Sequence, residues 1–262
     1  MNVSLLSQPL VDRDEYMTVA AARSLHDHSV CFVGIGMPST AANLAKRLHA
    51  PNLVLIYESG VIGAKPTVLP LSIGDEELAV TADSIVSVPE IFNYWLQAHR
   101  VDVGFLGAAQ LDRYANINTT VIGDYDHPRV RLPGAGGAPQ IATGCGEVLI
   151  IVRQSRRTFV EHLDFVTSVG QRRGDADRAA LGLAGRGPVR VVTDLGILEP
   201  DPDTGELVLT SVHPGVEVSE VLEATGWTLR VSPDLAVTEE PTAEERDTLR
   251  ALKMAGSTRP HD

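Results

Sequence analysis

The sequence predicts an α/β fold with an open, mostly parallel sheet and helices on both faces. Short apolar runs rich in Val, Ile and Leu alternate with segments of helical spacing, and most of these runs end in glycine or another small residue. The chain has 262 residues, of which 44% are hydrophobic, so it can bury a large core. No internal repeat and no linker interrupts it. We therefore expect a single domain over residues 1–262, with residues 1–12 and 256–262 loosely ordered.

The first three predicted elements are a helix, a strand and a second helix. Residues 13–27 contain good helix formers and carry apolar side chains at helical spacing. Residues 29–36 form a β-branched apolar run that closes on two glycines, which predicts a strand. A second helix is predicted over residues 38–50, because Pro38 presets φ for the first turn and Ser39 can cap it.

Two further strands enclose a loop and a helix. Residues 52–60 begin as a fully apolar run, which fits a parallel strand covered on both faces. Residues 65–78 contain two prolines and a Gly-Asp pair and predict an ordered loop. A helix is expected over residues 87–101, followed by a strand over 101–110. The inner face of that helix should carry Ile91, Phe92, Trp95 and Leu96.

The second half of the chain is richer in turns. Residues 116–152 alternate short β-rich runs with glycine and proline turns, and their last strand, over 147–152, is strongly apolar. Residues 171–188 are glycine-rich and charged, which predicts an excursion on the surface. Residues 189–201 and 206–215 predict a strand pair, joined by a turn that contains Asp and Gly.

A helix over residues 242–252 is the last predicted element. Thr242 and Glu245 stand three residues apart, which is the spacing of a capping box. The repeated alternation of strands and helices is what predicts a mostly parallel sheet, because parallel neighbours need long crossover connections.

The charge of the chain argues against some classes of function. The formal net charge is −12 and the pI is about 5.1, so the summed field repels nucleic acid and anionic lipid. The densest basic group consists of Arg153, Arg156 and Arg157, with Arg172 and Arg173 further along. We interpret it as a solvated basic edge, with an anion or subunit contact as the alternative. Neither a nucleic-acid partner nor a membrane partner is expected.

The cysteine and histidine patterns do not predict a metal site. Cys31 and Cys145 lie far apart without CxxC spacing, which argues against a disulfide framework or a zinc site. A nucleophilic Cys145 is conceivable, but its neighbourhood suggests no paired histidine. The eight histidines show no metal-ligand spacing. The chain starts without a signal-like segment and has no long uncharged apolar run, so we expect a cytoplasmic protein.

Two glycine-rich turns follow predicted strands, and strand ends are where open α/β sheets place their sites. Residues 34–39 read GIGMPS, but Ser39 replaces the third glycine of the dinucleotide fingerprint, so a structural turn is favoured over a phosphate site. Residues 134–139 read GAGGAP and lack the lysine of a P-loop. Beside a nucleophile, such a bare backbone could hold an oxyanion and lower a barrier by roughly 3 to 4 kcal/mol.

Glu58 is the sharpest single candidate for chemistry. It directly follows the apolar run LVLIY and precedes Ser59 and Gly60. A carboxylate that loses solvation becomes a stronger nucleophile, so the end of a buried strand suits a covalent role. The alternative is a glutamate that caps the turn or reaches water, and the local residues by themselves favour that alternative.

Longer segments carry a resemblance to a known family. They are MTVAAARSLHDHSVCFVGIGMPSTAANLA, LIYESG, VLPLSIGDEEL, GFLGAAQLDRYANINTTVIGDYDHPRVRLPGAGGAPQIATGCGEV, RRTFVEHLDFVTSVG, VVTDLGILEPD and HPGV. In this order the chain resembles the β subunits of class I CoA-transferases, of the glutaconate CoA-transferase type, over nearly its whole length. Such ordered similarity is far more specific than a single glycine motif.

The resemblance implies a catalytic nucleophile and its surroundings. Glu58, in an intact Glu-Ser-Gly motif, should attack the acyl-CoA thioester and carry CoA as a glutamyl thioester. Ser59 and Gly60 should let substrate approach, and Gly136 or Gly137 should supply a backbone donor to the oxyanion. Relatives that have lost this glutamate act as hydrolases or decarboxylases, so its presence argues against those activities.

A second active-site segment is implied by the sequence AAQLDRYANIN. Gln110, Asn116 and Asn118 resemble the family's residues there and should line or orient the Glu58 site. The chain departs from many relatives at Ala115, where they carry glycine. That departure puts the local turn geometry in doubt, but not the two asparagines.

The resemblance also implies partners and substrates. An α subunit should complete the active site, in an α2β2 heterotetramer, and CoA should enter as a thioester substrate with no other cofactor. Succinyl-CoA and 3-oxoadipate are the preferred pair. The alternatives are glutaconate or another small carboxylic acid, or a non-catalytic or hydrolytic acyl-CoA-binding relative. Arg129 and Arg131 neighbour the glycine turn and are candidates for anion contacts or for structural roles.

Overall fold

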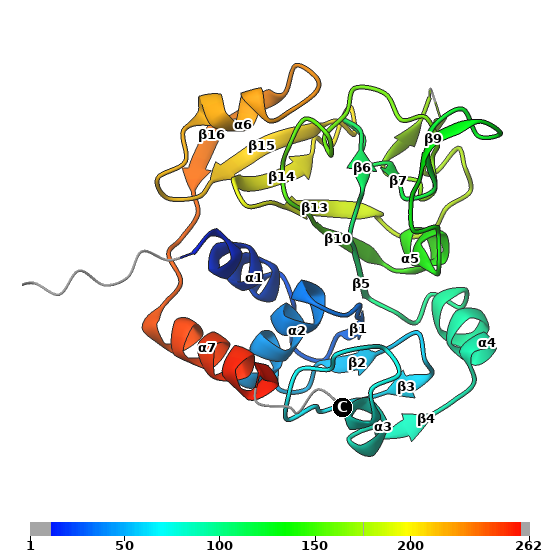
Figure 1. Ribbon diagram of the computed structural model, residues 1–262, viewed down its shortest axis with the longest axis vertical. Helices are drawn as coiled ribbons and strands as arrows, with labels where there is room; N and C mark the ends of the chain where they lie inside the picture. The colour runs from blue at the N-terminus through cyan, green and yellow to red at the C-terminus, as the bar shows by residue number, and fades with distance from the viewer. Residues whose placement is uncertain (1–11, 175, 258–262) are drawn as a thin grey trace, which may run out of the picture.

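The computed structural model describes residues 12–174 and 176–257, and its largest feature is a ten-stranded sheet (Figure 1). Its strands are β1 (Val30–Phe32), β2 (Val54–Ile56), β3 (Val61–Ile62), β4 (Ser84–Ile85), β5 (Val103–Leu106), β10 (Glu147–Ile151), β13 (Pro188–Val192), β14 (Gly196–Pro200), β15 (Leu207–Val212) and β16 (Arg230–Val237). Across the sheet their order is β16-β15-β14-β13-β10-β5-β1-β2-β3-β4.

The centre of the sheet is parallel, as the sequence predicts. Strands β13, β10, β5, β1 and β2 pair in parallel, and all four residues of β5 are buried. Antiparallel pairs flank this centre, because β2 returns through β3 to β4 on one side and β13 through β14 to β15 on the other. The sheet is therefore mixed and mostly parallel. The predicted strand pair over 189–215 is confirmed as β14 and β15, with β13 as a third strand of the same run.

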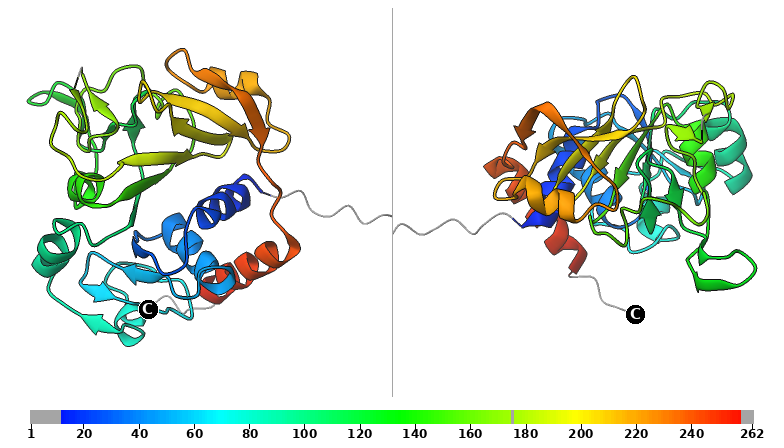
Figure 2. Two further views of the ribbon diagram at one scale, coloured as in Figure 1. Left: turned by 180° about the vertical axis from the view of Figure 1, so that it is seen from behind. Right: turned by 90° about the horizontal axis from the view of Figure 1, so that it is seen from above.

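Helices cover both faces of the sheet. α1 (Arg13–Arg23), α2 (Met37–Leu48) and α7 (Ala243–Ser257) lie together on one face in both the front and the back view (Figures 1 and 2). The other core contains residues of the π-helix η1 (Ile91–Leu96), α5 (Ala138–Gly144) and α6 (Val218–Glu223). Alternate side chains of β10 enter the two cores, Leu149 on the first and Val148 on the second.

The first two predicted helices are confirmed with shifted ends. The first ends at Arg23, four residues earlier than predicted. The second begins at Met37, because Gly36, with φ +85°, occupies its N-cap position. Ser39 therefore lies inside the helix, where its buried Oγ is 3.4 Å from the Tyr57 hydroxyl. The prediction that Ser39 caps this helix is wrong, whereas Pro38 does stand in its first turn.

The segment over 65–101 differs from the prediction in two places. The predicted loop ends in α3 (Glu76–Val80), whose N-cap Asp75 accepts a hydrogen bond from the Glu77 N–H at 3.0 Å. The predicted helix over 87–101 forms as α4 (Val88–Glu90) followed by η1. The inner face of η1 is as expected, since Ile91 and Leu96 are fully buried.

Three small hairpins and one helix occupy the turn-rich second half. The hairpins are β6 (Gln110–Leu111) with β7 (Ile117–Asn118), β8 (Val121–Gly123) with β9 (Pro128–Arg131), and β11 (Arg172–Arg173) with β12 (Ala176–Asp177). Helix α5 was not predicted, because residues 134–139 indicated only a turn. The excursion over 171–188 is largely exposed, but Arg178 within it is only 6% exposed, so the surface prediction is wrong for this residue.

The predicted capping box of the last helix is confirmed. The Thr242 N–H donates to Glu245 Oε2 at 2.7 Å, and the Glu245 N–H donates to Thr242 Oγ1 at 3.2 Å. The loose ordering expected for residues 1–12 and 256–262 falls mostly outside the described residues, although 256–257 belong to α7. None of the described helices has the length and apolar character that a membrane span requires.

A buried histidine makes the stability of this fold sensitive to acid. His213 is 1% exposed, stacks on the Tyr16 ring at 5.3 Å, and lies between the Thr193 carbonyl at 2.8 Å from Nε2 and the Thr238 hydroxyl at 3.0 Å from Nδ1. The carbonyl can only accept, so Nε2 carries the proton of a neutral ring. Burial lowers the pKa of His213 below its usual value of 6.5.

We expect His213→Gln to reduce the acid sensitivity of the fold. Because the folded pKa lies below the unfolded one, the stability contributed by neutral His213 is present above about pH 6.5 and is lost as pH falls below it. The drop in Tm between pH 7.5 and pH 5.5 should therefore be smaller in His213→Gln than in wild type. His127→Gln, at an exposed loop position, is the matched control. An unchanged pH dependence in His213→Gln would contradict this role.

Candidate active site

Glu58 lies in the tight turn that joins β2 to β3. The Tyr57 N–H donates to the Val61 carbonyl, and the Gly60 N–H donates to the Tyr57 carbonyl, both at 3.0 Å. These bonds leave Glu58 and Ser59 at the two central positions of the turn. Since β2 is parallel to β1, the turn stands at the carboxyl edge of the parallel strands, where sites of such sheets occur.

The glycine of the Glu-Ser-Gly motif is required by its geometry. Gly60 has φ +102°, and a Cβ on it would overlap the Val86 carbonyl oxygen. The Val86 N–H also donates to the Gly60 carbonyl at 2.9 Å, which fixes the turn against the segment that leads into α4. The Ser59 hydroxyl is buried and has no hydrogen-bond partner among the described residues.

The carboxylate of Glu58 lies against the glycine-rich turn. Its Oε1 is 3.6 Å from the position that a Cβ on Gly137 would take, and Cζ of Phe92 is 2.8 Å from the same position. Only glycine fits between the carboxylate and the ring. Gly137 is the N-cap residue of α5, and Gly136 before it is exposed with φ +49°. Within the described part of the chain, neither backbone N–H donates to a partner.

A cleft of about 360 Å³ lies at the carboxyl ends of β1, β5 and β10. The residues that line it are Met17, Gly34, Ile35, Met37, Pro38, Phe105, Leu106, Gly107, Thr119, Gly134, Ala135, Ala138, Ile151, Val152 and Arg153. The glycine turn is anchored there by the Gly134 N–H, which donates to the Thr119 carbonyl at 2.8 Å. Most lining side chains are apolar or absent, so the cleft suits an uncharged chain rather than a phosphate.

Gln110 and Asn118 lie side by side across the β6–β7 hairpin. The Asn118 amide donates to Gln110 Oε1 at 3.0 Å and to the Val121 carbonyl at 2.6 Å. Asn118 is fully buried and Gln110 is 9% exposed. The contacts of this pair order the hairpin and its connection to β8.

Asn116 has a different environment from Asn118. Its amide donates to Asp112 Oδ2 and to the Arg172 carbonyl, both at 2.8 Å, and its Oδ1 accepts from the Gly170 N–H at 2.8 Å. The side chain therefore orders its own segment, through three hydrogen bonds. Ala115 beside it adopts φ +58°, so this chain forms a left-handed turn there without a glycine.

The other sequence candidates lie elsewhere. Arg129 and Arg131 are exposed on the β8–β9 hairpin, which projects from the rest of the molecule (Figure 2). The Arg131 guanidinium lies 5.1 Å from the centre of the Tyr125 ring and donates to the Tyr125 carbonyl at 2.9 Å. His127 is likewise exposed in this hairpin.

The arginines of the predicted basic edge and the two cysteines have surroundings typical of structural residues. Arg153 is exposed and its Nη2 lies 2.6 Å from Asp14 Oδ1, while Arg156 and Arg157 face solvent. Cys31 and Cys145 are free and buried, and burial raises the pKa of Cys145 to about 12. Such a thiol is a poor nucleophile at neutral pH. The described residues contain no group of three or more His, Cys, Asp or Glu that could hold a metal ion.

Sequence reasoning missed Phe92 and Val86 as parts of the site. Both come from the segment over 84–96, which packs against the Glu58 turn and the glycine turn together. Phe92 was predicted on the inner face of a helix, so its burial was foreseen. Its contact with Gly137 was not, because it depends on how two distant segments meet.

Comparison with known proteins fits this arrangement. Residues 14–224 match the family described as coenzyme A transferase. The chain belongs to that family. This CoA-transferase chain is 61% identical over 240 residues to the B subunit of the 3-oxoadipate CoA-transferase of Pseudomonas knackmussii, a match that covers 92% of each chain.

Two solved structures are similar in fold to this CoA-transferase. It superposes on the glutaconate coenzyme A-transferase of Acidaminococcus fermentans with a TM-score of 0.85 at 34% identity, covering 92% of this chain and 94% of the other. It superposes on the decarboxylase AibA/AibB with a TM-score of 0.80 at 28% identity, covering 92% and 95%. The predicted fold class and family are thus confirmed. One scaffold serves relatives with different reactions, so the reaction is argued from the site.

Proposed function

We propose that this chain is the single-domain B subunit of an enzyme that transfers CoA from succinyl-CoA to 3-oxoadipate, with Glu58 as the covalent carrier. The observation that carries the proposal is the placement of the Glu58 carboxylate against Gly137, at the carboxyl edge of the sheet. The 61% identity to one component of a 3-oxoadipate CoA-transferase supports this choice of substrates.

The donor half of the reaction loads CoA onto the enzyme. A Glu58 carboxylate oxygen attacks the thioester carbonyl of succinyl-CoA, the C–S bond breaks, and CoA leaves as a thiolate from a succinyl–glutamyl anhydride. The thiolate then attacks the side-chain carbonyl carbon of Glu58. Succinate leaves with the electron pair of the broken C–O bond, and a glutamyl-CoA thioester remains.

The acceptor half reverses these steps. A carboxylate of 3-oxoadipate attacks the glutamyl thioester and expels the CoA thiolate, which then attacks the acyl carbonyl of the new anhydride. The product 3-oxoadipyl-CoA leaves, and Glu58 returns as a carboxylate. No proton is consumed and the thioester energy is conserved, provided that water is kept from the two anhydrides and the glutamyl-CoA thioester.

Each displacement passes through a tetrahedral oxyanion, for which we assign the N–H groups of Gly136 and Gly137 as donors. Gly137 lies against the Glu58 carboxylate, and neither N–H has another partner in the described structure. A fixed donor of this kind lowers a barrier by roughly 3 to 4 kcal/mol. Ser59 and Gly60 shape the turn beside it, while Gln110, Asn116 and Asn118 order the neighbouring hairpin.

The apolar cleft provides a route for CoA to Glu58. Its wall includes Gly134 and Ala138, which flank the proposed oxyanion donors. The pantetheine arm of CoA is uncharged and narrow, so a 360 Å³ cleft with little side-chain bulk can take it. We assign no further cofactor, since CoA enters and leaves as a substrate.

A second, A-type subunit is part of the proposal. The matched relative is itself named as the B component of its enzyme, and a solved relative is a two-component AibA/AibB protein. A companion chain that covers the Glu58 turn would exclude water from the anhydride. We infer an α2β2 heterotetramer that works in the cytoplasm.

The substrate assignment is tested with a panel of acceptor acids on the complex co-expressed with its A-type partner. With succinyl-CoA as donor, kcat/KM should be highest for 3-oxoadipate and lower for glutaconate and acetate. A higher value for glutaconate would move the assignment to the runner-up substrate, which the solved glutaconate enzyme makes reasonable. Release of CoA without any acceptor, as fast as transfer, would instead identify a hydrolase.

A further inference from the structure

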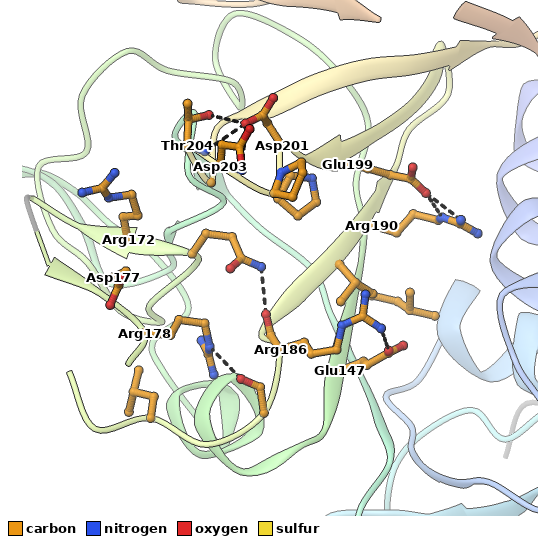
Figure 3. A pocket seen from close by; sticks show the side chains of 18 of the residues that line it. Glu147, Arg172, Asp177, Arg178, Arg186, Arg190, Glu199, Asp201, Asp203 and Thr204 are labelled. Carbon is orange, nitrogen blue, oxygen red and sulfur yellow. Dashed lines mark hydrogen bonds and ion pairs between the residues drawn. The ribbon is translucent and has the colours of Figure 1, made fainter. Parts of the chain in front are cut away.

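Arg178 is a charged side chain buried in the excursion that the sequence suggested was exposed. It is 6% exposed. Its Nη2 donates to the carbonyls of Ala142 at 3.0 Å and Ala184 at 3.2 Å, its Nη1 to Gly170 at 3.1 Å, and its Nε to Gly185 at 3.3 Å. One guanidinium therefore joins four carbonyl oxygens from three parts of the chain, beside α5 (Figure 3).

The charge of Arg178 has no carboxylate partner among the described residues. Burial accordingly lowers the pKa of its guanidinium. A buried charge without a counter-ion is costly and persists only when its hydrogen bonds are well made. Only the planar fork of arginine reaches four acceptors at once, so lysine is no equivalent here.

The first of these carbonyls connects Arg178 to the proposed oxyanion donors. Ala142 lies in α5, a helix of seven residues that begins directly after Gly137. The Ile141 N–H donates to the Gly137 carbonyl at 3.0 Å, so a single helical turn links Gly137 to the residue before Ala142. Ala142 is five residues beyond Gly137, a rise of only about 7.5 Å along the helix, so a shift at Ala142 is passed on to Gly137.

The second carbonyl connects Arg178 to the other active-site segment. The Gly170 carbonyl accepts from Arg178, and the Gly170 N–H donates to Asn116 Oδ1 at 2.8 Å. Asn116 belongs to the segment that also contains Asn118. The guanidinium thus ties α5 and the Gln110–Asn118 segment to the same excursion.

We propose that Arg178 is a positioning residue, which sets the distance between the Gly137 backbone and the Glu58 carboxylate by holding the far end of α5. This inference rests on the proposed function, because it assigns a purpose to that distance. Arg178 touches neither substrate nor Glu58. Its loss should therefore slow the chemical steps and leave substrate binding unchanged.

The surrounding cavity supplies a matched control. Arg178 lines a cavity of about 900 Å³ together with Arg186 and Glu147, which form an ion pair with each other (Figure 3). The Arg186 side chain is 72% exposed, and its hydrogen bond in the described structure goes to Glu147 rather than to α5. Arg186→Met removes an arginine from the same cavity without releasing the helix.

The test uses the complex with its A-type partner and compares Arg178→Lys, Arg178→Met and Arg186→Met with wild type. Steady-state kcat, KM for succinyl-CoA and the single-turnover rate of glutamyl-CoA formation are measured. We expect kcat and the single-turnover rate to fall at least tenfold in Arg178→Lys and further in Arg178→Met, with KM changed less than twofold. Arg186→Met should match wild type. Methylguanidinium, entering through the cavity, should partly restore kcat in Arg178→Ala.

The outcomes separate this inference from the proposed function. A wild-type complex that forms no glutamyl-CoA refutes the proposed function itself. Glutamyl-CoA formation at the wild-type rate in Arg178→Lys refutes only the positioning role, as would an equal loss in Arg186→Met or a change confined to KM. If Arg178→Met does not assemble, Arg178→Lys, which keeps the charge, decides the matter. If neither variant assembles, rescue of Arg178→Ala by methylguanidinium is the deciding experiment. Assembly that is restored without restored kcat would contradict the positioning role of Arg178.

Discussion

Replacement of Glu58 by glutamine should lower the kcat of CoA transfer on the order of 10⁴- to 10⁶-fold, as the loss of a covalent nucleophile does in other enzymes. The amide has nearly the size of the carboxylate, so the contacts of the turn with Gly137 and Phe92 should persist. Its uncharged nitrogen cannot attack the thioester and then release the acyl group. Steady-state kinetics of the assembled complex provide the measurement, with KM for succinyl-CoA expected near its wild-type value.

A matched control separates the loss of the nucleophile from the loss of one negative charge. Glu76 is an exposed glutamate in the first turn of α3, and Glu76→Gln should leave kcat unchanged. Full activity in Glu58→Gln would identify the chain as a non-catalytic partner. A rise in KM with kcat unchanged would mean that Glu58 binds substrate without carrying it.

The second large effect is expected for Gly137→Ala. The added Cβ would stand 2.8 Å from Cζ of Phe92 and 3.6 Å from Glu58 Oε1, so the ring, the turn or the carboxylate must move. Misplacement of a reacting group by about 1 Å costs on the order of 100-fold in rate. We therefore expect kcat to fall by about 100-fold or more, with the complex still assembled, as measured by single-turnover acylation of Glu58.

The control for this prediction is an alanine at a glycine with no such neighbours. Gly74 lies in an exposed loop, and a Cβ there would meet only Ser72 Oγ, at 3.9 Å. Gly74→Ala should retain full activity. If Gly137→Ala also acylates Glu58 at the wild-type rate, the close packing of Gly137 against Glu58 does not set the rate.

The centre of the fold could be predicted because its strands are mostly apolar. Runs such as those of β5 and β10 are buried on both faces, which requires parallel neighbours and covering helices. The strands at the margin of the sheet were harder to predict. Strands β3 and β4 have two residues each, and Ile85 in β4 is 61% exposed, so no periodic pattern marks them.

Missed elements of the site depend on contacts between distant segments. Helix α5 begins in a glycine-rich stretch whose composition indicates a turn, and its position is held in part by Arg178, 36 residues beyond Ala142. Phe92 and Val86 reach the Glu58 turn from another segment. The local composition of a segment does not indicate which distant segment it will contact.

The candidate site residues also divide into those with a local sequence signal and those whose roles depend on contacts with distant segments. Glu58 and Gly137 could be considered from local sequence, as a carboxylate at a strand exit and a bare glycine, but the local residues favoured a non-catalytic Glu58. The family resemblance reversed that preference and added Gly60. Asn116 and Asn118 could not be told apart in this way. One is enclosed by Asp112, Gly170 and Arg172, and the other by Gln110 and Val121.

The most direct measurement is the mass of the peptide that contains Glu58 after the assembled complex reacts with succinyl-CoA and is then reduced with borohydride. A glutamyl-CoA thioester is reduced to an alcohol, so the account predicts a peptide about 14 Da lighter, with the change at residue 58 in wild type and absent in Glu58→Gln. An unmodified Glu58 peptide from a complex that transfers CoA would contradict the covalent mechanism.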